Sequence, residues 1–212
     1  MSLLLTFITS LMLGMRHATD PDHICAVTTI VSRERSVPKA AGIGVLWGVG
    51  HTITLLLVGG AIIAFKIVLD ARLGLSLELC VAIMLIVLGA LNLFDVRASA
   101  RTTSNSRPFV VGVVHGLAGS AAAALLIVPL IDDPRWAVLY LLTFGLGTIV
   151  GMTVITLSIA APSLLAATHM PSLQRSLRVA SGAVSLVFGL YLAHKIGFTD
   201  GLFASDPRWT PR

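Results

Sequence analysis

The stretch Gly14-Met-Arg-His-Ala-Thr-Asp-Pro-Asp-His-Ile24 decides how the first part of this chain can fold. It places one Arg, two Asp and two His inside an otherwise apolar N-terminal segment. A charged side chain at the centre of a membrane helix costs about 2.5–3.5 kcal/mol, whereas each Leu, Ile or Phe recovers only about 0.3–0.6 kcal/mol. We therefore expect these polar side chains to face the interior of a helix bundle or a wet cavity, and not lipid.

The composition indicates an all-α integral membrane protein. Of the 212 residues, 56% are hydrophobic and 12% are charged, and the mean hydropathy is +0.92, whereas soluble domains carry about 25% charged residues. The net charge of +5 is scattered over short connections without a basic stripe, which argues against a nucleic-acid partner.

The apolar residues predict one transmembrane domain over residues 1–197, followed by a disordered tail over 198–212 that contains Pro207 and Pro211. Six apolar segments are long enough to be considered as spans. They are Leu3–Val31, Ala41–Phe65, Ser76–Leu93, Pro108–Ile131, Trp136–Ala161 and Leu177–Ile196. The first, third and fifth connections, counted together with Arg178 at the start of the last segment, hold eight Lys and Arg residues and the second and fourth hold three, so both termini are predicted to lie outside the cytoplasm.

The two halves of the chain, about 3–94 and 108–197, resemble each other. Gly14-x-x-His17 recurs as Gly112-x-x-His115, and Trp47-Gly-Val-Gly50 recurs as Phe144-Gly-Leu-Gly147. Ser76-Leu77 with Val87 and Gly89 likewise recurs as Ser176-Leu177 with Val187 and Gly189. Because each half contains three predicted spans, the halves would cross the membrane in opposite directions. This pattern predicts two inverted three-helix repeats, as in many secondary transporters.

The first segment cannot be a regular helix throughout. Pro21 has no N–H to donate to the carbonyl of His17, and its ring clashes with that turn. Asp is a favoured N-cap residue and Pro is favoured at the first helical position. The sequence therefore predicts a helix break at Asp20-Pro21, which would allow His17, Asp22 and His23 to converge although they point in different directions on a straight helix.

These convergent side chains suit a divalent transition metal. Two imidazoles and one carboxylate are typical of sites for nickel, cobalt, copper or zinc, whereas magnesium and calcium sites are mostly oxygen. His51, within the second segment, is predicted as a further ligand or as a residue that orients one. The alternative is a polar cluster that only joins helices through hydrogen bonds.

Three further residues are possible members or neighbours of the site. Asp20 would cap the second half-helix or add negative charge. Arg16 would pair with Asp20 or Asp22, and the alternative is a contact with the substrate. His115 would complete the site from the second half or form a hydrogen bond across the repeats. The second half has lost both acids, and Thr148 occupies the place of His51, so the site is expected to be asymmetric.

At these residues the sequence resembles the nickel/cobalt transporter (NiCoT) family and its shorter, UreH-like relatives. The family signature Arg-His-Ala-x-Asp-Ala-Asp-His-Ile is matched by residues 16–24, with Pro21 in place of Ala, and Phe-x-x-Gly-His-Ser-Thr-Val is matched by residues 47–54. The acids of the family's later motifs are absent here, at His115–Ser120 and Gly151–Thr156. The loss of these acids makes the UreH-like branch the closer match. The chain also has six predicted spans, where full-length members have eight.

The resemblance implies a secondary transporter that carries Ni²⁺ or Co²⁺ across a prokaryotic cytoplasmic membrane, more as uptake than as efflux. No prosthetic group or nucleic-acid partner is expected, and homo-oligomers or accessory subunits stay open. The chain lacks an ATP-binding signature. Two alternatives remain: an intramembrane zinc-dependent hydrolase that uses the same cluster, and a membrane subunit of a metal-handling complex. The sequence contains no His-Glu-x-x-His motif, which argues against the hydrolase.

Overall fold

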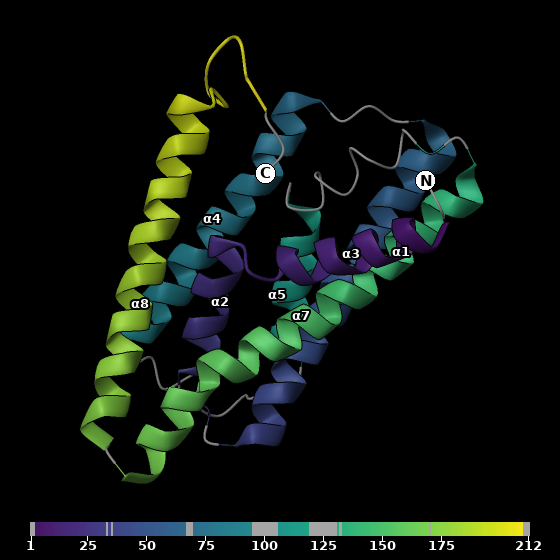
Figure 1. The fold of residues 1–212 in the computed structure, drawn as a ribbon. Helices are drawn as coiled ribbons and strands as arrows, with labels where there is room; N and C mark the ends of the chain where they lie inside the picture. Colours follow the sequence, from purple (N-terminus) through teal and green to yellow (C-terminus); the bar gives the residue numbers. More distant parts are fainter. Residues whose placement is uncertain are drawn as a thin grey trace.

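The described part of the chain consists of helices joined by turns and short irregular segments, without a strand. The computed structural model describes residues 3–32, 34, 36–66, 70–94, 106–118, 131, 133–169 and 171–209, without side chains at 163–171. The elements in this part of the chain are α1 (Leu3–His17), α2 (Pro21–Val31), α3 (Val37–Phe65), α4 (Ala71–Leu93), α5 (Ser106–Leu117), α7 (Pro134–His169), α8 (Pro171–His194) and the π-helical turn η3 (Lys195–Thr199). Figure 1 shows α4 and α8 side by side and α1 lying along α7.

Among the described residues, four helices are long and apolar enough to cross a bilayer, so the chain is a multi-pass membrane protein. They are Val37–Phe65, Ala71–Leu93, Pro134–Pro162 and Ser172–Thr199. They correspond to four of the six predicted spans. The first predicted span is divided between α1 and α2, and half of the fourth, Pro108–Ile131, lies outside the described residues, over 119–130. The fifth span was predicted to end at Ala161, but α7 continues through Pro162 to His169.

The first segment is broken at the predicted place. α1 ends at His17 and α2 begins at Pro21, with Asp20 extended at the N-cap position (φ −62°, ψ 143°). Pro21 at the first helical position explains the new start, because this position needs no N–H donor. The Asp20 carboxylate does not cap α2, contrary to one of the two expected roles.

Close helix contacts at glycines occur in pairs, in which a glycine of one half contacts the other half and its repeat counterpart makes the equivalent contact in return. A Cβ on Gly14 of α1 would overlap the carbonyl oxygen of Phe144 on α7, and a Cβ on Gly112 of α5 would overlap that of Trp47 on α3. Phe144 is the repeat counterpart of Trp47, and Gly112 is that of Gly14. α1 therefore contacts α7 through the positions that α5 uses to contact α3.

The pair α4 and α8 shows the same exchange. A Cβ on Gly89 would meet the backbone N of Leu186, and a Cβ on Gly189 would meet that of Ile86. The hydroxyl of Ser185 donates to the carbonyl of Leu85 at 3.0 Å. Gly189 is the repeat counterpart of Gly89, and Ile86 is that of Leu186, so the two contacts are equivalent. A local twofold axis between the two helices produces this pattern.

Asn92 joins α2 to this helix pair. Its buried side-chain amide lies 3.1 Å from the carbonyl oxygen of Thr29, 3.0 Å from Ser32 Oγ and 3.1 Å from Ser181 Oγ. The C-terminal end of α2 is therefore held against α4 and α8. Because α2 also carries Asp22 and His23, this contact fixes one end of the helix that bears half of the predicted site.

The C-terminal segment, predicted to be disordered, folds back on α4 as a series of turns over residues 200–209. The indole N–H of Trp209 donates to Glu78 Oε1 at 2.9 Å, and the ring packs over Gly74. The backbone N–H of Arg208 donates to the carbonyl of Asp200 at 2.9 Å. An aromatic residue near the end of the tail supplies apolar contact area that the Pro and Gly content of this segment did not suggest.

Replacement of Asn92 should destabilise the protein. Asn92→Ala would remove the donor shared by α2 and α8 and leave polar groups buried at their junction, a loss of about 1–3 kcal/mol in the free energy of unfolding. Thermal and chemical unfolding of the purified protein in detergent measures this change. Ser158→Ala is the matched control because its exposed hydroxyl bonds only within its own helix; equal stability of both variants would contradict the role of Asn92.

Two glycine substitutions should have opposite effects. Gly112→Ala would force α5 away from Trp47 and lower stability by about 1–3 kcal/mol. Gly60→Ala on α3, where an added Cβ meets nothing within 4 Å, should stabilise by up to about 1 kcal/mol through helix propensity. The same unfolding measurement tests both, and an unchanged or raised midpoint for Gly112→Ala would disprove the close contact.

Candidate metal centre

Four histidines from four helices meet at the break in the first segment. His17 is the last residue of α1, His23 lies in the first turn of α2, and His51 and His115 lie within α3 and α5. Ring centroids are 4.7 Å apart for His17 and His23, 5.0 Å for His17 and His51, and 4.6 Å for His23 and His115. All four side chains are buried. The break thus brings His17 and His23 together as the sequence predicted.

The ligand atoms form two overlapping groups that share His23. One group contains His17, His23 and His51, the other contains Asp22, His23 and His115, and the ligand atoms within each lie within 4.8 Å of one another. Nitrogen ligands about 2.0–2.1 Å from a metal lie at most about 4.2 Å apart. Small side-chain movements would therefore bring either group onto one ion.

Several ring nitrogens in the first group have no hydrogen-bond partner among the described residues. They are Nε2 of His17, Nε2 of His23 and both nitrogens of His51. Buried polar atoms are nearly always hydrogen-bonded, so each exception calls for an explanation. Imidazole nitrogens with an available lone pair are the commonest metal ligands in proteins, and this arrangement fits a transition-metal dication.

Two carboxylates orient the rings. Asp20 Oδ2 lies 2.8 Å from His17 Nδ1, and Asp22 Oδ1 lies 3.1 Å from His23 Nδ1. Each carboxylate can accept the Nδ1–H and leave Nε2 deprotonated for a metal, as carboxylate–histidine pairs do in metal sites. The second oxygen of Asp22 lies 3.7 Å from His115 Nε2, so Asp22 lies between the rings of the two halves.

Aromatic walls enclose the cluster on both sides. The indole of Trp47 stacks on His23, with ring centroids 5.7 Å apart and an interplanar angle of 18°, and lies 5.3 Å from the ring of His115. Phe144, its repeat counterpart, lies 5.7 Å from His17. Trp47 and Phe144 therefore place apolar ring surface against the histidines.

A cavity of about 200 Å³ adjoins the break. Asp20 and Asp22 line it together with Glu78 of α4, and Leu192 and Ile196 form apolar walls. Three carboxylates therefore border this cavity, and two of them pair with histidines of the cluster. The sequence-based prediction did not include Glu78. Its position in the apolar segment Ser76–Leu93 could have identified it, because a charged residue there has the same cost of leaving water as those of residues 14–24.

Arg16, and His194, for which the sequence predicts no role in the site, lie apart from the rings. Arg16 is exposed on α1, and its side chain makes no ion pair with a described residue, so the predicted pairing with Asp20 or Asp22 is absent. Asp20 pairs with His17 instead. His194 lies at the end of α8 beside Phe198, away from the cluster, and the side chain of His169 lies outside the described residues.

Sequence comparison connects this geometry with a known protein. The chain is 35% identical over 210 residues to the urease accessory protein UreH of Bacillus sp. (strain TB-90). The aligned region covers 90% of this chain and 91% of that protein. The chain belongs to the UreH-like branch of the nickel/cobalt transporter family. No protein-family model matches the chain, and no solved structure matches it.

In this UreH-like chain the second half provides fewer ligands than the first. His115 joins the cluster through Asp22 and His23. Thr148, the repeat counterpart of His51, instead donates its hydroxyl to the carbonyl of Phe144 at 3.0 Å within its own helix. The described site is therefore asymmetric, with His17, Asp22, His23 and His51 from the first half and His115 from the second.

Asp20 should tune the affinity of the site although it contacts a histidine and not the cluster centre. Asp20→Ala would release the His17 ring, and loss of such orienting partners lowers metal affinity by about 10–100-fold. Titration calorimetry with Co²⁺ on the purified protein measures the affinity, and Asp206→Ala in the exposed tail is the control. An unchanged affinity for Asp20→Ala would exclude the orienting role.

Proposed function

We propose that the protein is a secondary transporter of Ni²⁺ or Co²⁺, and that His17, Asp22, His23 and His51 bind the ion during transport, with His115, Asp20 and Glu78 beside them. The observation that carries the proposal is the convergence of buried histidines with unpartnered ring nitrogens beside a carboxylate-lined cavity. Imidazole with carboxylate suits these metals, and the family to which the chain belongs is named for nickel and cobalt transport. The metal is cargo, and the proposed activity is not enzymatic.

We further propose that the two halves form an inverted repeat that alternates access to the site. The exchanged contacts of Gly14 with Phe144 and of Gly112 with Trp47 support this arrangement, as do those of Gly89 and Gly189. In such a transporter the ion is bound at the interface of the repeats while the halves rock around it. The cluster is built from helices of both halves, as this mechanism requires.

Charge and cavity position support uptake across the cytoplasmic membrane with both termini outside. The connections rich in Lys and Arg follow α2 and α4 and precede α8, and by the positive-inside rule they face the cytoplasm. The cavity lined by Glu78, Leu192 and Ile196 then lies on the outer side of the cluster, near the end of α8. Ions would enter there, and Asn92 would hold the cytoplasmic end of α2 closed.

Transport by the purified protein tests the proposal. Proteoliposomes that contain the wild type should accumulate Co²⁺ and Ni²⁺ in a fluorescent-indicator assay, without a nucleotide or another subunit. His23→Ala should abolish accumulation and bring Co²⁺ binding to background, because both ligand groups lose their shared member. His17→Ala and His51→Ala should each weaken binding by about tenfold or more.

His194→Ala is the matched control, since this histidine lies in α8 outside the cluster. It should transport like the wild type, and the elution volume on size exclusion shows whether each variant is folded. Wild-type accumulation by folded His23→Ala would disprove the site assignment. Absence of metal accumulation by the wild type would reject the transporter proposal and favour a subunit that requires partners.

A further inference from the structure

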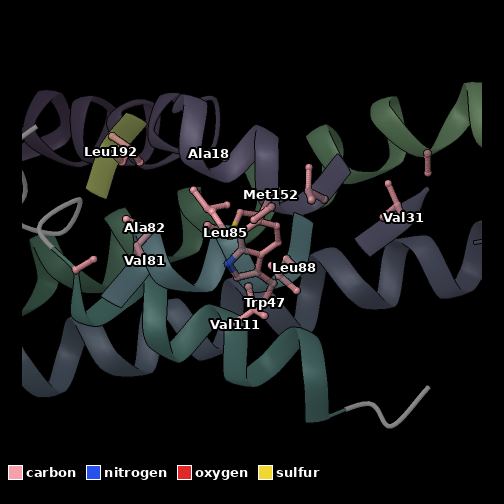
Figure 2. Close-up of a cluster of buried hydrophobic side chains, with 14 of the residues drawn as sticks. Ala18, Val31, Trp47, Val81, Ala82, Leu85, Leu88, Val111, Met152 and Leu192 are labelled. Carbon is pink, nitrogen blue, oxygen red and sulfur yellow. The ribbon is translucent and has the colours of Figure 1, made fainter. Parts of the chain in front are cut away.

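A second, much smaller cavity lies on the other side of His23. It has a volume of about 10 Å³, and the residues that line it include His23, Trp47, Met152 and Thr156. Figure 2 shows Trp47 in the interior together with Met152 and Ala18, another residue of the cavity wall. The histidine cluster therefore lies between two cavities, a large one lined by carboxylates and a small one lined by neutral side chains.

Three polar atoms of these lining residues have no hydrogen-bond partner in the described part of the chain. They are Thr156 Oγ1, Trp47 Nε1 and His23 Nε2, and Thr156 and Trp47 are each 1% exposed. The other threonines of α7 with described side chains bond to the carbonyl one turn earlier, as Thr153 does to Ile149 at 2.7 Å. Thr156 makes no such bond, so its oxygen is available to a ligand.

The chain direction places this small cavity on the side of the cluster opposite to the large one. Met152 and Thr156 follow Thr148 by one and two turns of α7, toward the end at which α8 begins. Trp47 precedes His51 by one turn on α3. In the orientation proposed above, an ion that leaves the histidines for the cytoplasm passes this position.

We propose that Thr156 and Met152 form a transfer point that receives the dication from His23 on its way to the cytoplasm. This inference rests on the proposed transport function. A hydroxyl oxygen and a thioether sulfur are neutral, weak ligands, and conduction requires sites from which an ion can also leave. The cavity has about the volume of one water, so the ion passes with most of its hydration shell removed, and the Trp47 N–H can hold the remaining water oxygen.

The test separates binding from transport. Thr156→Val keeps the shape of the side chain and removes the oxygen, so Co²⁺ should bind to the purified protein with wild-type affinity. The initial rate of Co²⁺ uptake into proteoliposomes should fall by about tenfold, and Thr156→Ser should restore it. Thr153→Val, whose hydroxyl bonds to Ile149 on the same helix, is the control and should transport normally.

Each outcome decides the proposal. Wild-type uptake by folded Thr156→Val overturns it, while the transport function stands if His23→Ala is inactive. Loss of equilibrium binding in Thr156→Val also overturns it, because Thr156 would then belong to the main site. If Thr156→Val does not fold, Met152→Leu carries the same test: slowed uptake with unchanged affinity supports the transfer point, and unchanged uptake rejects it.

Discussion

The structure depends on one missing hydrogen bond. Pro21 cannot continue the helix that begins at Leu3, so α1 ends at His17 and α2 starts in a new direction. The change of direction places the rings of His17 and His23 4.7 Å apart, which a straight helix would not allow. Around this break α3, α5 and α7 pack closely through glycines. The four histidine side chains are therefore buried next to one another.

The two halves share their packing and differ in their chemistry. Exchanged glycine contacts relate α1 on α7 to α5 on α3, yet Thr148 replaces His51 at the centre. Away from the centre, Asn92 binds the end of α2, whereas its counterpart Leu192 is an apolar wall of the large cavity. In the proposed transport cycle the halves rock between two states, and unlike residues at matching positions would make those states different in energy.

Much of the site could be predicted because the energetic signal is strong. The charged residues in an apolar segment identify the cluster, and Pro21 identifies the helix break. Neither inference needs tertiary information. The partner of Asp20 could not be read in this way, because His17 lies on the preceding helix and the geometry of the turn decides the pairing. The contacts of Trp47 with two histidines and of Trp209 with Glu78 join segments far apart in sequence, and a single sequence carries no local pattern for them.

X-ray absorption at the cobalt edge of the purified protein, loaded with one equivalent of Co²⁺, shows whether the histidine cluster binds a transition metal directly. With direct binding, we expect nitrogen and oxygen ligands near 2.0–2.1 Å, as for imidazole-bound metals in proteins, with outer-shell scattering from at least two imidazole rings that decreases in His17→Ala. A shell of oxygen atoms without imidazole scattering, or a spectrum unchanged in His17→Ala, would contradict it.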